Sequence, residues 1–446
     1  MYKFKQMFNY RKNTLRYFYI FLFIHLFIWT LIPSITNNNL PLDTIEALAW
    51  GSNLDWGFEK HPPASAFFVE LFYFLFGSQD WAYYLLSQIF VIFSFFIVFQ
   101  LSEKIFNNKT LSFLSVILLE GIYFYNFTTP EFNVNVCQLP FWSLTVFYAW
   151  KIFDGKKINI YHCFYLAIFS AIGFQSKYLF IYLLVSIFIL FFYQIIILKE
   201  RKFDFKYLIS IEVFFILLVP HLVWLFNNDF ITIKYALSRA GLEEVNYINH
   251  LKFPIIFLMK QILILLPVLI MLFLILKKIK INLNLNDRKL LFLLIINILP
   301  ILLVLLTSIM SGSKIRTMWM TPFYLFFGTL LIYIFQNYLE MKKIKNFLIF
   351  FIFLFFLSPI SYGTVSLLKD NKRTDYPGKE IAIEVEKKWN SEFKDPINVV
   401  LGDEWTAGNL SYHLKSRPAW EGIVDKSKLD SYNKYICLEK ICVGVK

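Results

Sequence analysis

The chain has 446 residues, of which 58% are hydrophobic and 20% aromatic, while only 17% are charged. A typical soluble domain is about half apolar and about a quarter charged, so a water-soluble globule of this composition would expose too much apolar surface to stay dispersed. The same numbers exclude a disordered chain. The composition predicts a polytopic membrane protein. The formal net charge is +13, and its meaning depends on where along the chain the basic residues lie.

Eleven stretches approach the length of about 20 mostly apolar residues that a membrane-spanning helix needs. They are Tyr17–Pro33, Trp81–Leu101, Leu111–Tyr125, Val136–Phe153, Tyr161–Phe174, Leu179–Leu198, Tyr207–Phe226, Ile255–Leu276, Leu290–Ile309, Pro322–Tyr338 and Phe347–Ser366. The third and the fifth are short. We read the first as a span, because no small-residue cleavage site follows it.

Lys and Arg are unevenly distributed between these predicted spans. If the N-terminus is cytoplasmic, the segments on that side carry 22 of them, the loops on the other side carry seven, and the tail after residue 366 carries 14. Cytoplasmic loops of membrane proteins are enriched in Lys and Arg, so the count predicts a cytoplasmic N-terminus and a tail on the outer side. The excess positive charge is then an insertion signal, and no nucleic-acid partner is expected.

Two outer segments are longer than simple connectors need to be. Ser34–Asp80 mixes acidic residues with apolar stretches too short to span, and its part 64–76 suits a helix lying at the membrane interface. Asn227–Pro254 is polar and contains a short helical pattern at 232–240. Because the loops on the inner side are short and plain, we expect the functional residues on the outer face.

The tail differs in composition from the rest of the chain, with 14 basic and 13 acidic residues in its 80 positions. Its patterns predict helices over 378–393 and 406–414, a strand over 397–401 and a terminal hairpin over 435–445. We therefore predict a transmembrane domain over 1–366 and a small α/β domain over 367–446. Cys437 and Cys442 flank the turn of the hairpin, and the spacing is compatible both with a disulfide in an oxidising compartment and with two unpaired thiols.

The first outer segment holds the residues best suited to chemistry. It reads Asp43-Thr-Ile-Glu46-Ala-Leu-Ala-Trp50 and later Lys60-His61-Pro-Pro. Acids at the outer face can take a proton from an acceptor or hold a cation, and the Lys-His pair on a stiff turn is suited to a phosphate. The Trp50 ring could stack on a sugar. The alternative is that interfacial loops collect Trp, and that the acids there are simply solvated.

This stretch, together with the later Leu75-Phe-Gly77 and Trp81, resembles the first outer loop of bacterial GT-C glycosyltransferases. That group includes the protein O-mannosyltransferases of glycosyltransferase family 39 and the aminoarabinose transferases that modify lipid A. In the group an Asp, usually followed by Glu, begins the catalytic segment, and a His-Pro-Pro or Lys-Pro-Pro turn closes it. This chain has Thr44 after Asp43, and His61 where the lipid A enzymes tend to have Lys, which favours the broader group.

The resemblance implies an α-helical polytopic GT-C fold with about 11 transmembrane helices, interfacial helices in the first outer loop and a small α/β C-terminal domain. It implies a place among the lipids of the bacterial inner membrane, with that domain periplasmic. The activity implied is transfer of a hexose or pentose from a polyprenyl-phosphate-linked donor to an envelope acceptor, with inversion at the anomeric carbon. The acceptor could be lipid A, another glycolipid, a polysaccharide or a protein. Asp43 would be the general base, with Glu46 and Lys60 among the substrate contacts.

Two further outer loops supply candidate residues. Glu131 is expected to be a second active-site carboxylate beside Asp43, or alternatively a helix cap after Pro130, and Asn133 in the same loop suits hydroxyl recognition. Similar sequences carry a Lys-Tyr pair at the position of Lys177, which implies contact with the donor phosphate. The alternative for Lys177 is a lysine at a helix end that reaches to the membrane surface.

Lys314 and Arg316 lie on a Gly/Ser-rich turn that resembles the basic loop before a late span in this group. They could bind the donor phosphate or an anionic acceptor, or they could anchor lipid headgroups. Arg239 in the long outer loop is a further candidate. Some GT-C enzymes use a divalent ion, which Asp43 and Glu131 could hold. Because the lipid A and mannosyl branches generally do not require one, no metal or other cofactor is predicted.

The rival class is a polytopic lipid or sugar transporter or flippase without transferase activity. Many spans and the intramembrane acids Glu120 and Glu212 would suit it, although neither acid has a basic residue at helical spacing. Transporters concentrate polar residues at the membrane midplane, often with inverted repeats. Here the polar residues gather in the outer loops, so the transferase is the preferred interpretation.

Overall fold

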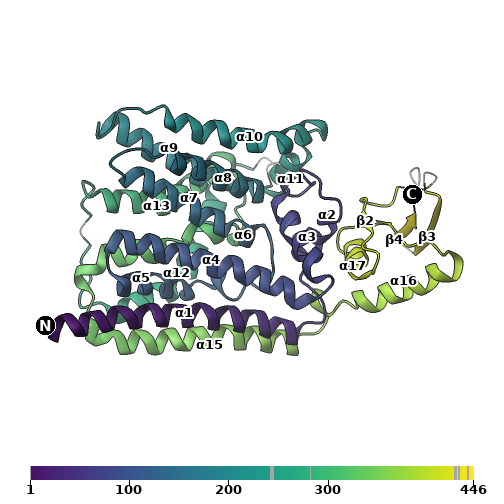
Figure 1. Ribbon diagram of the computed structural model, residues 1–446, viewed down its shortest axis with the longest axis horizontal. Coiled ribbons are helices and arrows are strands. Elements are labelled where there is room, and N and C mark those ends of the chain that lie inside the picture. Colours follow the sequence, from purple (N-terminus) through teal and green to yellow (C-terminus); the bar gives the residue numbers. More distant parts are fainter. Residues whose placement is uncertain are drawn as a thin grey trace.

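The computed structural model describes residues 2–241, 246–281, 283–425, 429, 432–438 and 441–445. Helices with long axes running side by side form a bundle, and a small α/β unit lies at one end of it (Figure 1). The bundle consists of α1 Tyr2–Thr36, α4 Asp80–Phe106, α5 Lys109–Ile117, α7 Leu139–Asp154, α8 Ile160–Ser176, α9 Ile181–Phe192, α10 Lys206–Asn227, α12 Asn249–Ile275, α13 Arg288–Ser311, α14 Phe327–Phe335 and α15 Ile344–Leu368. The predicted helical bundle with a small C-terminal α/β unit is confirmed.

Shorter helical pieces join or extend these helices. The outer segments contain α2 Leu42–Gly51, α3 Ala64–Phe76, α6 Val134–Cys137 and α11 Ile231–Arg239. Segments of 3₁₀ helix cover Leu118–Gly121, Tyr123–Tyr125, Tyr178–Phe180, Thr317–Tyr324, Gln336–Tyr338, Met341–Lys343 and Arg373–Asp375, and Tyr193–Ile197 is π-helical. The expected interfacial helix at 64–76 is α3, and the pattern at 232–240 is α11, shifted by one residue.

Each of the eleven apolar stretches is helical, but their lengths differ. Seven helices in the described ranges are long and apolar enough to cross a membrane, and there are eight if Thr317–Tyr324 and Phe327–Tyr338, bent by 54°, form one span. The predicted spans at 111–125, 136–153 and 161–174 correspond to α5 with its 3₁₀ extension, to α7 and to α8. A helix of 16 residues such as α7 is about 24 Å long, short of the roughly 30 Å hydrocarbon core. The chain is a multi-pass membrane protein, and of these short helices α7 is mostly buried against its neighbours.

A buried polar pair joins α1 to the end of the 3₁₀ segment after α5. The His25 side chain is 0% exposed and Glu120 is 3% exposed, and His25 Nδ1 lies 2.7 Å from Glu120 Oε1. The Asn126 side-chain amide donates to the Glu120 carbonyl oxygen at 2.9 Å and to its Oε2 at 3.3 Å. The partner of Glu120 is therefore a histidine 95 positions away in the chain, which no local spacing could indicate.

The segments expected on the outer side gather at one end of the bundle. Helices α2, α3 and α11 and the C-terminal unit lie there, while the N-terminus lies at the opposite end (Figure 1). This common location agrees with the arrangement expected from the distribution of Lys and Arg. Which end faces the cytoplasm stays a prediction.

The C-terminal unit packs two helices on a four-stranded mixed sheet. Its elements are α16 Gly378–Glu392, β1 Val399–Leu401, α17 Thr406–His413, β2 Ala419–Trp420, β3 Lys434–Leu438 and β4 Ile441–Val445. The strand order is β2-β1-β4-β3, with β1 parallel to β2 and antiparallel to β4. Val385 and Trp389 on α16 and Leu410 on α17 form a core with Val400 of the sheet. The predicted helices, strand and hairpin are confirmed, and turn residues 439 and 440 lie outside the described residues.

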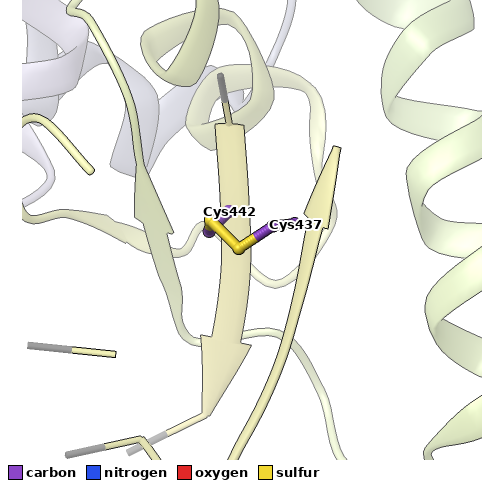
Figure 2. The surroundings of a disulfide bond; sticks show 2 residues. All are labelled: Cys437 and Cys442. Carbon is purple, nitrogen blue, oxygen red and sulfur yellow. A yellow bond between two sulfur atoms is a disulfide. The ribbon is translucent and has the colours of Figure 1, made fainter. Parts of the chain in front are cut away.

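A disulfide joins the two strands of the terminal hairpin (Figure 2). Cys437 on β3 lies directly opposite Cys442 on β4, with their Cα atoms 4.0 Å apart. Of the two alternatives that the spacing left open, the structure has the disulfide. Because disulfides persist in oxidising compartments, this bond favours a position of the unit outside the cytoplasm.

The unit is docked on the first outer segment. The Arg417 guanidinium pairs with the Glu70 carboxylate on α3 and donates to the Leu48 carbonyl oxygen of α2 at 2.6 Å. The Tyr412 hydroxyl donates to Asp80 Oδ1 at the start of α4 at 2.7 Å. These contacts reach three helices of the membrane part, so the unit is held against the bundle by more than its covalent link to α15.

The His25–Glu120 pair leads to a stability prediction. Removing one member of a buried hydrogen-bonded pair costs about 1–3 kcal/mol, because the other is left without a partner. We expect His25→Leu and Glu120→Leu each to lower the Tm of the purified protein in detergent, and the double variant to lose less than the sum of the two. Glu212→Leu, at an exposed position on α10, is the control. Strictly additive losses would contradict the coupling.

Candidate active site

A cavity of about 380 Å³ lies at the end of the bundle where the outer segments meet. Its walls come from α2 and the Lys60-His61-Pro62 turn, from residues 134–135, from the junction of α8 and α9, from α11 and from the 311–319 loop. Seven of the eleven predicted site residues line it: Asp43, Glu46, Lys60, His61, Lys177, Arg239 and Arg316. These seven residues come from five separate segments of the chain, which thus converge at one place.

Asp43 lies in the first turn of α2, and a carboxyl group from another loop caps that turn. The residue before the helix is Pro41, whose side chain cannot accept a hydrogen bond. The Asp43 N–H instead donates to Glu131 Oε1 at 3.1 Å, and the Thr44 hydroxyl donates to the Phe132 carbonyl oxygen at 3.2 Å. Glu131 therefore lies beside Asp43, as expected, and it also caps a helix, which is α2 rather than one that follows Pro130.

The two carboxyl groups perturb each other. Burial raises the pKa of the Asp43 carboxyl, while the charges of Lys177 and Lys60 oppose the rise. Burial, followed by the charge of Asp43, raises the pKa of Glu131 to about 8, and hydrogen bonds from the Asp43 N–H and the Asn133 side chain partly oppose this. Near neutral pH Glu131 therefore keeps its proton, while the charges of Lys177 and Lys60 favour the ionised form of Asp43.

Lys60 is held between two carboxylates. Its Nζ lies 2.9 Å from Glu46 Oε1 and 3.2 Å from Glu404 Oε1. Burial alone would lower the pKa of Lys60, but the hydrogen bonds and charges of the two carboxylates outweigh it and raise that pKa. Glu404 belongs to the C-terminal unit, and sequence analysis did not identify it as a site residue. Lys60 is thus a cation whose charge is compensated within the protein.

His61 lines the cavity as a neutral group. Burial, together with the charges of Lys177, Lys60 and Arg239, lowers the pKa of His61 to about 3. The expectation of two adjacent cationic donors on this turn therefore holds for Lys60 and not for His61. A neutral imidazole can still donate and accept hydrogen bonds.

Trp50 lies behind the cavity rather than in its wall. It is 2% exposed, its ring is stacked on Phe58 with centroids 5.5 Å apart, and the His61 ring meets it edge-on at 5.9 Å. Position 50 falls in α2, whose inner face is buried, so the indole packs in the core. The open aromatic face expected from the sequence is not available there, and Trp50 instead supports the turn that carries His61.

Lys177 is directed into the cavity. It follows α8, is only 6% exposed, and its Nζ donates to Asn135 Oδ1 at 2.6 Å. The ammonium also lies 5.2 Å from the centroid of the Trp319 ring. Burial lowers the pKa of Lys177 to about 7, and the charge of Asp43 opposes the shift. A buried ammonium with three N–H donors that lines a cavity does not fit the alternative of a lysine reaching to the membrane surface.

Asn133 organises the loop on which Asn135 lies. Its Oδ1 accepts from the backbone N–H groups of Asn135 at 2.9 Å and Val136 at 3.2 Å, and so caps the short helix α6. Asn133 is not among the cavity-lining residues, whereas Asn135, two positions on, is. The amide-rich loop was identified from the sequence, but the side chain that reaches the cavity is the neighbouring one.

The basic residues of the late loops divide into two groups. Arg239 at the end of α11 and Arg316 both line the cavity. The Lys314 side chain is exposed and lies outside the lining, while its backbone N–H donates to the Ala240 carbonyl oxygen at 2.9 Å and ties the two loops together. Gly312 makes this turn possible, because its φ of +66° is a left-handed conformation that favours glycine.

The residues named above supply both acidic and basic groups to the cavity. Asp43 supplies a carboxyl group to the cavity wall, and Lys177, Arg239 and Arg316 supply basic side chains around the same space. In the part of the chain that the structure describes, no group of three or more His, Cys, Asp or Glu side chains is arranged to hold a metal ion.

Comparisons with known proteins agree with the resemblance seen in the sequence. The family model described as Dolichyl-phosphate-mannose-protein mannosyltransferase matches residues 60–224. The crystal structure of ArnT from Cupriavidus metallidurans bound to undecaprenyl phosphate is similar with a TM-score of 0.64 at 10% identity, covering 92% of this chain and 86% of that chain. No curated protein matches the chain. The predicted resemblance is confirmed, and the chain has an ArnT-like GT-C fold.

The carboxyl pair leads to a pH prediction. Because Glu131 has a pKa of about 8 in the folded protein, we expect its proton to leave as the pH rises through about 8. The carboxyl C=O band in infrared difference spectra should disappear over that range and be absent in Glu131→Gln. The folded protein keeps this proton at pH values where an unfolded Glu has lost it, so the stabilising contribution of Glu131 falls as the pH rises toward 8.

The control for this prediction is Glu59→Gln, which changes an exposed acid of the same outer segment. It should leave both the band and the pH dependence of the Tm unchanged. A wild-type band that has already vanished at pH 6 would show that Glu131 is ionised at neutral pH.

Proposed function

We propose that the protein is an integral membrane glycosyltransferase that moves a sugar from a polyprenyl-phosphate donor to an acceptor hydroxyl. In this proposal the cavity faces the outer side of the bacterial inner membrane, with the N-terminus cytoplasmic and the C-terminal unit periplasmic. The observation that carries it is a cavity that the Asp43 carboxyl group lines together with the basic side chains of Lys177, Arg239 and Arg316, within an ArnT-like fold. The family match and the undecaprenyl phosphate named for the structural neighbour support the choice of donor.

Asp43 acts as the general base in the proposed reaction. The acceptor hydroxyl oxygen attacks the anomeric carbon, its proton moves to the Asp43 carboxylate, and the bond from that carbon to the phosphate oxygen breaks. Attack from the face opposite the leaving group inverts the anomeric centre. Burial raises the pKa of Asp43, which makes the carboxylate a better proton acceptor, and the hydrogen bond to Glu131 fixes the first turn of α2 on which it lies.

Lys177, Arg239 and Arg316 stabilise the leaving group. The polyprenyl phosphate gains negative charge as the bond to the sugar breaks, and cations already in place lower the energy of that transition state. Lys177 has a lowered pKa of about 7 in the unliganded cavity. A phosphate beside it would favour the ammonium form, so donor binding and protonation of Lys177 reinforce each other.

The other predicted residues fall into two roles in this proposal. Neutral His61 and the Glu46–Lys60 pair, which line the cavity, contact the sugar. Trp50 and Asn133 act indirectly, by holding the His61 turn and Asn135. Lys314 ties the 311–316 loop to the end of α11 through its backbone.

One assay separates this function from transport. A labelled polyprenyl-phosphate sugar is supplied to the purified protein in detergent, where no sealed compartment exists, together with cell-envelope extract as acceptor. We expect label to move to the acceptor fraction and free polyprenyl phosphate to be released. Binding of the donor without any transfer or release would favour the transporter or flippase.

We expect Asp43→Asn to lower the transfer rate by at least about 100-fold, the range that a general base contributes, while membrane insertion and donor binding persist. The isosteric amide cannot take the proton but preserves the shape of the first turn. Asp55→Asn, in the same outer segment but outside the cavity lining, serves as the control and should retain activity. Near-normal transfer by Asp43→Asn rules out its role as the base.

We expect Lys177→Met to weaken binding of polyprenyl phosphate by about tenfold or more, because a hydrogen bond to a charged group contributes about 1.5–3 kcal/mol. The KM for the acceptor should change little. Lys314→Met removes a lysine outside the cavity and is the matched control. The measurement is titration of the detergent-solubilised protein with polyprenyl phosphate. Equal losses in both variants would indicate a general effect of positive charge.

A further inference from the structure

A second cavity, of about 350 Å³, lies where α15 leads into the C-terminal unit. Six residues line it: Asn371, Lys372, Arg373, Asp375, Tyr376 and Trp405. The first five belong to the link that follows α15, and Trp405 comes from the start of α17. The cavity is therefore built jointly by the end of the membrane part and by the C-terminal unit, and none of its residues is used in the proposed transfer.

Most charges around this cavity are already compensated. Lys372 Nζ lies 3.0 Å from Asp375 Oδ1, and Asp375 Oδ2 accepts from the Lys372 N–H at 3.0 Å. Asp403 nearby accepts from the N–H groups of Trp405 and Thr406, each at 3.0 Å. Arg373 is exposed, and its guanidinium forms no ion pair with any described residue. The cavity thus presents one uncompensated cation.

An aromatic pair lies beside this cation. The rings of Tyr376 and Trp405 have centroids 5.4 Å apart and planes inclined by 57°, and both side chains are half-buried. Ligand sites combine apolar or aromatic walls with a few polar groups that orient the ligand. Aromatic rings, the Asn371 amide and the Arg373 guanidinium together suit a saccharide that carries an anionic group, since guanidinium binds phosphate or carboxylate through two parallel hydrogen bonds.

The second cavity is tied to the first through neighbouring residues. Glu404 pairs with Lys60 in the first cavity at 3.2 Å, and the next residue, Trp405, lines the second. The Asn38 N–H, five positions before Asp43, donates to the carbonyl oxygen of Thr374 at 3.0 Å. The Arg373 charge is close enough to Asp43 to oppose the rise in its pKa that burial causes. A ligand held by Arg373 would therefore lie near Asp43.

We propose that this second cavity is an acceptor subsite that binds an anionic saccharide of the acceptor through Arg373 and the Tyr376–Trp405 pair. The proposal rests on the proposed function for its meaning as an acceptor site, but binding to the cavity can be measured without any transfer. It assigns the C-terminal unit a direct part in substrate recognition.

The test uses the full-length protein in nanodiscs and saturation-transfer NMR with glucose 1-phosphate and glucose as observed probes, and with inorganic phosphate, which has no carbon-bound protons, as a competitor. We expect glucose 1-phosphate to bind best, because it alone offers both the ring and the anion. Arg373→Gln should weaken it by about tenfold or more, and Trp405→Leu, which keeps apolar packing but removes the aromatic ring, should reduce transfer of saturation to the sugar protons. Lys369→Gln, an exposed lysine of the same link outside the lining, is the control.

Several results would overturn the subsite. They are the absence of wild-type binding, equal binding by Arg373→Gln and wild type, and inorganic phosphate competing as well as the sugar phosphate. A further experiment titrates phosphatidylinositol in the nanodisc. If the protein binds it more tightly than glucose 1-phosphate, the ligand is a lipid-borne saccharide; if it binds the two equally, the ligand is a free saccharide. Asp43→Asn should bind the probes normally, and Arg373→Gln should still bind polyprenyl phosphate. If probe binding depends on Arg373 while neither the wild type nor any variant transfers sugar, the subsite is supported and the proposed transfer is contradicted.

Discussion

The first turn of α2 begins without a hydrogen-bonding side chain of its own, and the arrangement of the cavity depends on the carboxylate that fills this gap. Pro41 precedes the helix, so the Asp43 N–H needs an acceptor from elsewhere, and it finds one in Glu131, 88 positions later in the chain. An unpaired buried N–H is costly. Asp43 can therefore take its position only when the 126–135 loop is in place, and that loop is anchored in turn by the hydrogen bonds from Asn126 to Glu120 inside the bundle.

Lys and Arg side chains have different roles at the two ends of the bundle. At the end opposite the cavity, Arg288, Lys289 and Lys343 donate to the last carbonyl oxygens of α7, α4 and the chain just after α12, at 2.8, 2.6 and 2.8 Å. Cations there satisfy helix C-termini and the helix dipole as well as forming the predicted insertion signal. At the cavity end the cations instead face carboxylates or open space. Burial there lowers the pKa of Lys177 to about 7, so a negative ligand beside it would favour its charged form.

Local patterns predicted the helices, the tail elements and the convergence of Asp43, Lys177 and Arg316, because apolar length and charge distribution determine which loops meet at the same end. The pairings inside the site could not be predicted in this way. Glu404 reaches Lys60 only because the C-terminal unit folds back on α2, and no local signal marks it. Trp50 is the converse case, a residue that the sequence placed in the site and the structure places behind it. Its position in an outer segment suggested an open ring, but the buried face of a helix that the sequence analysis did not anticipate encloses it.

The contact between the C-terminal unit and α2 leaves little freedom for either to move alone. A Cβ added at Gly408 of α17 would lie 3.1 Å from side-chain atoms of Ile45 and Ala49 and 3.2 Å from the Ile45 carbonyl oxygen, so the α17 backbone packs directly on α2 at this point. Such close packing resists sliding. Because Ile45 lies two positions after Asp43, a shift of the unit would displace the turn that carries Asp43, the proposed base. A substrate held on the unit is for that reason held in a constant position relative to Asp43, which is the condition that proximity catalysis requires.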